Sequence, residues 1–387
     1  MKKILIVNSF YAPTIVGGAE MYTQTLAESL VNNYDVYVLS TNGHTSGTIL
    51  REKINGVHVY RLPLHNIYWP GDKEQRNSIC KLIWHTKNLY NRKQSVQIKN
   101  IIREINPDLV HTQNLMGIGT EIWRIVRKNK IPLVHTIHDY QLITPVTNNF
   151  INKVCCLINR KRSKYVDFVT SVSNYTLNEH LKKSFFKKKE HQIIPNSFVH
   201  KRLKRNKRES KQPLKACFIG QIEEIKGIYL LFKLLEKLNS SILSRLVVCG
   251  TGSKVNEVRE FSKKDNRLEY KGHLPIENLQ EIIAQSDILL VPSVWEEPFG
   301  RVIIESYNQG TPVIAANVGG ISEIVYSKKW LFNKNDIDDF VSKVYHFYSL
   351  TNVEIKREIE LSYKTSNFYR ENITQHIKMY DKLVNKI

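Results

Sequence analysis

The sequence predicts an α/β protein made of two Rossmann-like domains, each a doubly wound parallel sheet covered by helices. Short apolar runs alternate with helix-length amphipathic segments along the chain, which is typical of parallel strands joined by helices. The length of 387 residues corresponds to two domains at roughly 150 residues each. The alternation is interrupted by the basic stretch KRLKRNKRESKQP at 201–213. We therefore expect domains at 1–200 and 214–365, a linker at 201–213 and a ligand cleft between the two sheets.

The elements of the first half follow from this alternation. The opening apolar run stops at Asn8, which is too short for the core of a signal peptide and predicts a buried first strand instead. The predicted strands are 3–7, 36–40, 57–61, 109–112, 133–137, 168–172 and 192–194. The helices expected between them include 19–32, 78–105 and 120–128.

The second half repeats the pattern and ends in helices alone. Its predicted strands are 215–219, 245–248, 269–271, 288–291 and 312–315. Its predicted helices are 228–238, 255–262, 276–285 and 299–308, followed by a helical region over about 335–387. Ligands of such sheets bind beyond the carboxyl ends of the strands, so motifs at those ends are the candidates for function.

Composition and charge exclude several classes of protein. Hydrophobic content of 42% fits a globular chain, and no stretch approaches the roughly 18 apolar residues that span a bilayer. The five cysteines are scattered without metal-site spacing, which favours a reduced, cytoplasmic chain. The net charge of +21 divides into +14 over 1–200, +6 over 201–213 and +1 over 214–387. The first half is therefore expected to meet a polyanionic partner.

Two motifs lie at predicted strand ends of the first half. Gly17 and Gly18 open a helix with Glu20 in its first turn, where backbone N–H groups can approach an anion. The alternative is an ordinary tight turn. His138 and Asp139 follow the strand 133–137, where the imidazole can donate to a ligand and the carboxylate can tune it. A satisfied structural histidine is the alternative.

A third motif, 220–227, follows the first strand of the second half. It has the sequence GQIEEIKG and places Lys226 just before a helix. A cation there can meet a phosphate that is already held by backbone amides. A solvated lysine beside a turn glycine is equally consistent with the motif alone.

The most informative segment is 292–305, with the sequence PSVWEEPFGRVIIE. Glu297 precedes the helix predicted from Phe299, and Glu305 lies about two turns along it. The two carboxylates would then lie at different positions along the helix axis, with the free amides of the helix start between them. This arrangement suits a ligand with hydroxyls at both ends and a diphosphate in the middle. A general acid/base pair acting on one bond, or two solvated glutamates, are the alternatives.

With these motifs the sequence resembles the family 4 retaining glycosyltransferases of the GT-B fold (glycosyl transferases group 1). The resemblance spans nearly the whole chain and is carried by GGAE at 17–20, PDLVH at 107–111, His138-Asp139, Lys226-Gly227, and the EPFG segment followed by GTPVIA and VGG. It implies a helix at about 366–387 that packs back on the first domain.

The resemblance also implies roles at matching positions. Glu305 would hold the ribose hydroxyls, and Glu297 the donor sugar. Backbone amides of Phe299 and Gly300 would bind the diphosphate together with Lys226, and Gly17 and Gly18 would approach the phosphates. His138 would lie near the transferred sugar, with Asp139 and Glu20 on the acceptor side. No metal or other cofactor is expected, because Lys226 and the helix start replace it.

One departure concerns the diphosphate. The family usually has arginine where this chain has Gln221, and Arg301 in the EPFG segment is the candidate replacement. Arg301→Ala should then weaken donor binding more than Gln221→Ala.

The resemblance assigns acceptor binding to the basic first half. Segments 67–70, 79–90 and 185–189 mix aromatic and cationic residues, as anionic-lipid-facing surfaces do. We therefore expect a peripheral enzyme at the inner face of a membrane. It would move a sugar from a nucleotide-sugar donor, UDP-linked first and GDP-linked second, to a glycan or lipid-diphosphate-linked acceptor in cell-surface polysaccharide synthesis. A basic nucleic-acid-binding protein and a non-catalytic sugar-binding homologue are the alternatives, although no recognised nucleic-acid module is present.

Overall fold

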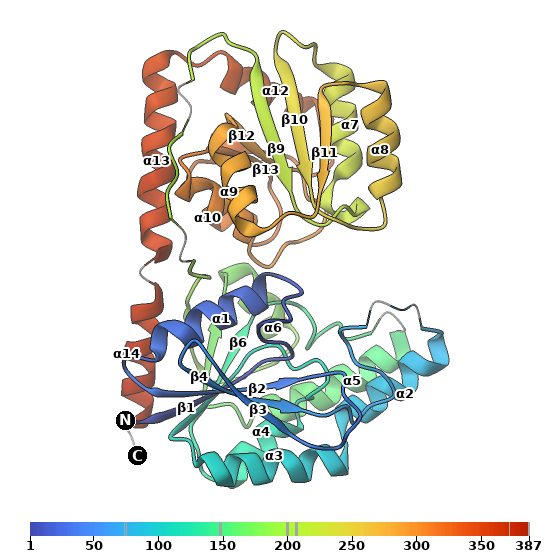
Figure 1. Ribbon diagram of the computed structural model, residues 1–387, viewed down its shortest axis with the longest axis vertical. Helices are drawn as coiled ribbons and strands as arrows, with labels where there is room; N and C mark the ends of the chain where they lie inside the picture. Colours follow the sequence, from blue (N-terminus) through green and yellow to red (C-terminus); the bar gives the residue numbers. More distant parts are fainter. Residues whose placement is uncertain are drawn as a thin grey trace. The chain divides into compact units, whose positions relative to one another are not determined.

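The chain forms two compact units. The computed structural model describes residues 1–72, 74, 76–146, 149–198, 201–205, 208–370 and 372–385. Unit 1 comprises Met1–Ser197 and Asn372–Ile387, and unit 2 comprises Phe198–Glu371. Each unit holds one predominantly parallel sheet with helices packed on it (Figure 1).

The sheet of unit 1 has the order β3-β4-β2-β1-β5-β6-β7-β8. All neighbours are parallel except β3 and β4. Strand order reverses beside β1, which pairs with both β2 and β5. The strands are β1 (Lys3–Val7), β2 (Asp35–Thr41), β3 (Leu50–Ile54), β4 (Val57–Leu62), β5 (Leu109–Thr112), β6 (Leu133–Ile137), β7 (Phe168–Ser171) and β8 (Glu190–Ile193).

Hydrophobic cores cover both faces of this sheet. One core contains residues of α1 and α14, including Leu26 and Tyr380, and the other contains residues of α3 and α4, including Ile101 and Trp123. The helices are α1 (Gly18–Leu30), α2 (Ser78–Leu89), α3 (Arg92–Ile105), α4 (Glu121–Lys128), α5 (Asn149–Ser163), α6 (Asn174–Lys182) and α14 (Asn372–Val384). The last helix of the chain is thus part of the core of unit 1.

Unit 2 is wound in the same way. Its sheet is parallel throughout, in the order β11-β10-β9-β12-β13-β14, and reverses beside β9. The strands are β9 (Leu214–Ile219), β10 (Leu243–Cys249), β11 (Leu268–Gly272), β12 (Ile288–Val291), β13 (Val313–Ala316) and β14 (Leu331–Phe332). The helices are α7 (Ile228–Lys237), α8 (Val255–Lys264), α9 (Ile276–Gln285), α10 (Arg301–Asn308), α11 (Ile321–Ile324), α12 (Ile337–Tyr348) and α13 (Asn352–Arg370), with 3-10 turns at Glu224–Lys226 and Lys328–Trp330.

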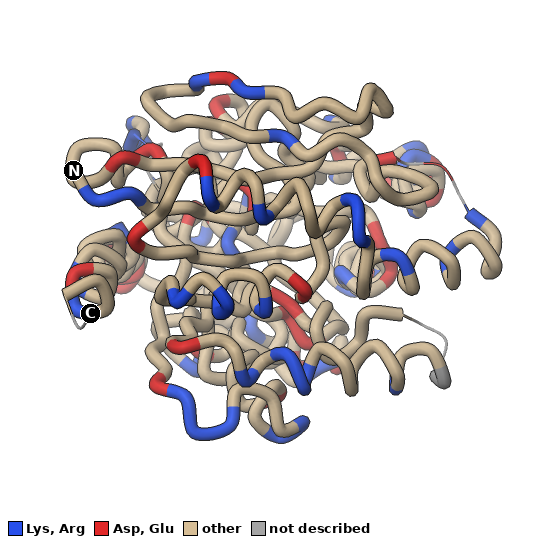
Figure 2. The backbone as a smooth tube through the Cα atoms, turned by 90° about the horizontal axis from the view of Figure 1, so that it is seen from below, with Lys and Arg blue, Asp and Glu red and all other residues tan. Residues whose placement is uncertain are grey.

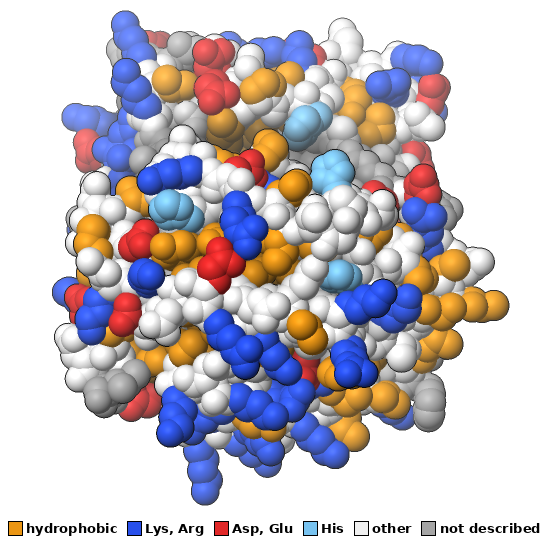
Figure 3. All heavy atoms as spheres, turned by 60° about the horizontal axis from the view of Figure 1, so that its bottom comes forward, with side chains coloured by type: hydrophobic (Ala, Val, Ile, Leu, Met, Phe, Trp, Pro, Cys, Tyr) orange, Lys and Arg blue, Asp and Glu red, His pale blue; other side chains and the backbone are white. Residues whose placement is uncertain are grey.

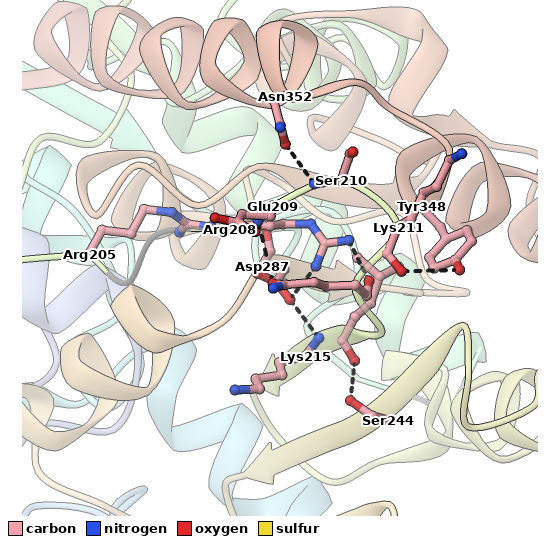
Figure 4. Close-up of polar contacts among 12 residues, drawn as sticks. Arg205, Arg208, Glu209, Ser210, Lys211, Lys215, Ser244, Asp287, Tyr348 and Asn352 are labelled. Carbon is pink, nitrogen blue, oxygen red and sulfur yellow. Dashed lines mark hydrogen bonds and ion pairs between the residues drawn. The ribbon is translucent and has the colours of Figure 1, made fainter.

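The described residues of 201–213, which we expected to form a linker, pack on unit 2. Arg208 Nη1 lies 3.0 Å from Asp287 Oδ2, and Lys215 N donates to the same oxygen at 2.8 Å. Arg208 also donates to Gln212 O at 2.9 Å (Figure 4). Arg205 donates to Asp287 O at 3.3 Å. The half-buried carboxylate of Asp287 attracts these two arginines, so Arg205 and Arg208 stabilise the fold of unit 2.

The boundary of the returning helix also differs from the expectation. Helix α13 continues to Arg370 within unit 2, and unit 1 resumes at Asn372 with α14. Arg370 Nη2 donates to Asn308 Oδ1 at 2.7 Å, which ties 370 to unit 2. The helical segment expected to return from about 366 therefore does so only from 372.

The segments expected to form an aromatic basic surface divide between core and surface. Phe185 and Phe186 are 0% and 2% exposed, so the surface expected at 185–189 is wrong for its two aromatic rings. Segment 79–90 does reach the surface through Ile79, Leu82 and Ile83. Lys and Arg are spread over the helices and loops seen in Figure 2. No helix in the described ranges combines the length and apolar character needed to cross a membrane.

Candidate functional site

Two loops of unit 2 interlock at the carboxyl ends of adjacent strands. β9 leads to the turn Glu224–Lys226, and β12 leads to the segment beginning at Pro292. Backbone N–H groups of Val294 and Trp295 donate to Ile225 O at 2.9 and 3.2 Å. Gly227 has φ +77°, and a Cβ there would lie 1.8 Å from Pro292 O. Only glycine permits this approach, which brings the lysine loop against the EPFG segment.

This approach places Lys226 against Glu297. Lys226 Nζ lies 2.5 Å from Glu297 Oε1, and their side chains are 19% and 12% exposed. Ser293 Oγ donates to the same carboxylate oxygen at 2.6 Å. The ammonium also lies 5.4 Å from the centre of the Trp295 ring. The structure therefore joins two predicted site residues into one charged group, held by a hydroxyl and an aromatic face.

The backbone of Glu297 is held from the other side by the VGG turn. Gly320 N donates to Glu297 O at 2.7 Å, and Gly319 N donates to Glu296 Oε2 at 2.7 Å. Gly319 has φ +51°, and a Cβ there would lie 2.3 Å from Glu297 O. Close packing of backbone on backbone thus orients the carboxylate of Glu297 from both sides.

Helix α10 begins directly after this segment. Gly300 is its N-cap with φ +109°, and Phe299 is buried with its ring centre 6.0 Å from that of Tyr369. The first N–H groups of a helix have no partner within the helix and attract anions. The structure thus has a helix start directly after Phe299 and Gly300, and binding of a diphosphate there stays a prediction.

The predicted diphosphate cation Arg301 has another partner in this structure. Its Nε lies 2.8 Å from Glu305 Oε1, and the two side chains are 10% and 11% exposed. Gln221, the residue at the usual arginine position, is exposed in the loop after β9. Arg301 therefore orients the carboxylate expected to bind ribose, a contact that the sequence analysis did not foresee.

Unit 1 carries the second group of predicted residues. Gly17 and Gly18 open α1, and Gly17 N donates to Glu20 Oε2 at 2.8 Å. Burial raises the pKa of Glu20, and its contact with Gly17 partly offsets that shift. Glu20 therefore caps the glycine turn, which is a structural role for a residue that we expected on the acceptor side.

His138 and Asp139 follow β6, as expected. His138 Nε2 lies 2.8 Å from Gln113 Oε1, which also accepts from Thr23 Oγ1 at 2.8 Å. Burial lowers the pKa of His138 to about 3, so the ring is neutral. With an oxygen beside Nε2, the hydrogen is assigned to Nε2 and Nδ1 is left as an acceptor. Asp139, whose pKa is raised by burial, accepts from Gln141 N at 2.8 Å.

Three supporting residues were not anticipated. Ser293 and Trp295 contact the Lys226–Glu297 pair, and Gln113 orients His138. Gln113 could have been found, because it follows the strand 109–112 at the same sheet edge as His138. Across the residues that the structure describes, no group of three His, Cys, Asp or Glu side chains could hold a metal ion.

Family models match both halves of the chain. "Glycosyltransferase Family 4" matches residues 16–202, and "Glycosyl transferases group 1" matches residues 200–360. Each match covers the strand-end motifs described for one unit.

Two curated relatives align with most of the chain. An uncharacterized 42.6 kDa protein in the cps region of Klebsiella pneumoniae is 32% identical over 351 residues, covering 88% of this chain and 91% of the relative. The GPI3 subunit of phosphatidylinositol N-acetylglucosaminyltransferase from Saccharomyces cerevisiae is 22% identical over 392 residues, covering 98% and 79%.

Solved structures share the fold over the full length. Sucrose-phosphate synthase from Thermosynechococcus elongatus has a TM-score of 0.76 at 16% identity and covers 100% of both chains. An Anabaena protein in complex with UDP and glucose has a TM-score of 0.66 at 15% identity, again with 100% coverage.

The fold and the strand-end site define a glycosyltransferase of the GT-B class. More narrowly, the chain belongs to the family 4 glycosyltransferases.

Proposed function

We propose that the protein transfers a sugar from a nucleotide-diphosphate donor bound by unit 2, with retention of anomeric configuration and without a metal ion. The observation that carries this proposal is the group formed by Lys226, Glu297 and the start of α10. A cation, a carboxylate and the N-terminal end of a helix match a sugar diphosphate, whose hydroxyls donate and whose phosphates accept.

The charges of this group support a role for each residue in binding one part of the donor. Lys226 and the N–H groups at Phe299 and Gly300 neutralise the diphosphate. Glu297 accepts from sugar hydroxyls, and Glu305 accepts from ribose. Lys226 and Glu297 neutralise each other in this structure. When the donor binds, Lys226 exchanges its contact with Glu297 for one with phosphate, and Glu297 exchanges its contact with Lys226 for contacts with sugar hydroxyls.

The reaction then needs positioning and charge stabilisation more than a side-chain base. The bond from the anomeric carbon to the leaving phosphate oxygen breaks, and a bond from the same face of that carbon to the acceptor oxygen forms. The acceptor's proton passes to the leaving phosphate. Lys226 and the helix start stabilise the negative charge that develops on the diphosphate.

The names of similar proteins support the donor class and a lipid-linked or polysaccharide acceptor. The Anabaena neighbour is in complex with UDP and glucose. One relative is a subunit of a phosphatidylinositol N-acetylglucosaminyltransferase, and another comes from a cps region. We therefore propose a UDP-sugar first and a GDP-sugar second, and a glycan or lipid-diphosphate-linked glycan as acceptor on unit 1. We propose a role in cell-surface polysaccharide synthesis on the same grounds.

The test is release of nucleoside diphosphate from a panel of UDP-, GDP- and ADP-sugars, with and without EDTA. We expect one donor class to be turned over, unchanged turnover with EDTA, and retention at the anomeric carbon by NMR. Glu297→Gln should lower turnover about 100-fold, whereas Glu236→Gln on the exposed side of α7 should leave it unchanged. Failure to turn over any donor would favour a non-catalytic sugar-binding homologue, and equal activity of the two variants would remove Glu297 from the site.

A further inference from the structure

Helix α2 leaves an apolar stripe on the surface of unit 1. Ile79, Leu82 and Ile83 are 68%, 40% and 42% exposed. They lie at the i, i+3, i+4 spacing that places side chains on one helical face. Trp84 is the buried residue that anchors the helix. An amphipathic helix with its apolar stripe outward points to a partner surface.

Helix α5 presents a second stripe of the same kind. Val154 and Leu157 are 42% and 40% exposed. The cations Lys153, Arg160 and Lys161 are exposed on the same helical face, at spacings of 7 and 8 residues from Lys153, and the exposed Lys164 follows the end of the helix. This helix was not predicted from the sequence.

The two helices form one surface of unit 1. They contact each other, and Figure 1 shows them side by side at the same end of the unit. Segments 78–90 and 149–164 contain Lys and Arg but no Asp or Glu, as the tube in Figure 2 shows. Figure 3 shows hydrophobic side chains gathered beside Lys and Arg on the right, over this end. We call the exposed stripes of α2 and α5 the α2–α5 face.

A basic pocket lies at one end of this face. It encloses about 390 Å³, and its lining includes Tyr90, Arg124, Lys161, Arg162, Lys164 and Tyr165. Glu121 pairs with Arg124 and with Arg162, the latter at 2.8 Å. One carboxylate therefore pairs with two arginines. Two lysines line the same pocket, which leaves excess positive charge for phosphate.

The chemistry of the face distinguishes among possible partners. Protein interfaces are depleted of lysine at their cores, whereas lysines border the apolar stripe here. Surfaces that bind single-stranded nucleic acid stack bases on aromatic rings, whereas the stripe residues are aliphatic. An anionic bilayer accepts both features, since aliphatic side chains enter the acyl boundary while lysines extend to the headgroups.

We propose that the α2–α5 face docks unit 1 on an anionic lipid bilayer, with the basic pocket taking a lipid phosphate. The inference deepens the proposed function, because a lipid-linked acceptor lies in such a bilayer. Each lysine near the surface contributes about a fivefold gain in binding, the equivalent of about 1 kcal/mol. Reversing two of them should weaken binding by at least about 25-fold.

The experiment is co-sedimentation of the full chain with vesicles of phosphatidylcholine alone or with about a third phosphatidylglycerol. We expect binding to the anionic vesicles alone, with release as salt rises. The double variant Leu82→Ser/Ile83→Ser should lose the apolar contribution to vesicle binding. The double variant Lys161→Glu/Lys164→Glu should lose the electrostatic contribution. The matched controls lie on unit 2: Val353→Ser/Phe368→Ser, at residues 79% and 60% exposed, and Lys233→Glu/Lys356→Glu at exposed lysines. Melting temperatures establish that each variant is folded.

The outcomes separate docking from catalysis. Loss of vesicle binding by both α2–α5 variants, with controls bound and nucleotide release intact, supports the proposal. Equal binding by variants and controls would overturn it, as would absence of binding to anionic vesicles while nucleotide release persists. Binding of a single-stranded RNA in place of vesicles, lost in the same variants, would assign the face to nucleic acid. Absence of nucleotide release with vesicle binding retained would instead contradict the proposed function.

Discussion

Arg301 and Glu305 form an ion pair across one turn of α10, with Arg301 Nε 2.8 Å from Glu305 Oε1 and both side chains about nine-tenths buried. The two residues were expected to hold different parts of the donor. Their pairing makes Arg301 a positioning residue for Glu305, because it fixes the carboxylate expected to accept from ribose.

Arg301→Ala should lower the affinity for the nucleoside diphosphate about tenfold, the scale of one lost coupling between two contacting charged residues. Because the effect passes through Glu305, affinity for the nucleoside without phosphates should fall by the same factor. Titration calorimetry with UDP and uridine measures both. Gln221→Ala, at an exposed residue, should change either affinity less than twofold.

The double variant supplies the internal control. In a Glu305→Gln background, Arg301→Ala should have little further effect, because the pair is already broken. If Arg301→Ala weakened UDP alone and left uridine unchanged, Arg301 would contact the diphosphate directly.

Acid should destabilise unit 1, because it buries five histidines whose pKa values lie below the ordinary range: His111, His135, His138, His180 and His376. Burial lowers the pKa of His376 to about 3, whereas an unfolded histidine titrates near 6.5. The unfolded chain therefore binds more protons below about pH 6.5, and stability falls as pH falls. The free energy of unfolding should drop by up to about 2 kcal/mol per histidine at pH 5. Thermal melting at pH 7.5, 6 and 5 measures this.

His376 offers the sharpest variant, since it joins α14 to Tyr22 and packs near His111. His376→Gln removes one titrating group, so the loss between pH 7.5 and pH 5 should shrink by up to about 2 kcal/mol. The exposed His191 in the same unit serves as control, and His191→Gln should leave the pH dependence unchanged. An equal pH slope for the two variants would contradict the assignment of His376.

Asp287→Ala should destabilise unit 2, because the Asp287 side chain is only 14% exposed and pairs with a buried arginine. Its partner Arg208 is 2% exposed at the side chain, and burial lowers the pKa of Arg208. Asp287→Ala leaves this cation without its carboxylate, so unfolding should become easier by about 3 kcal/mol. Urea unfolding followed by circular dichroism measures the shift.

The matched control is Asp338→Ala. Asp338 pairs with Lys237, and the two side chains are 80% and 47% exposed, so the change should stay within about 0.5 kcal/mol. Equal effects at the two aspartates would show that the 201–213 segment contributes little to unit 2.

Local pattern predicted most of the central strands. β1, β5, β6 and β12 have the predicted bounds, because strands buried on both faces form short and mostly apolar runs. β3 was missed, since LREKI is an exposed edge strand without apolar alternation. The helix expected over 78–105 divides into α2 and α3, because Asn91 caps α3 by accepting from Gln94 N at 3.2 Å.

The sequence alone determined the two doubly wound domains, the positions of Lys226, Glu297 and His138 after strand ends and that of Glu305 in the helix that follows, because hydrophobic periodicity and turn residues act over a few positions. The tertiary structure decided what those residues contact. Lys226 meets Glu297 across 71 positions because β9 and β12 are neighbours in the sheet, whereas Phe185 and Phe186 enter the core and the 201–213 arginines pack on unit 2. Contacts and burial of this kind depend on residues distant in sequence, so no local pattern encodes them.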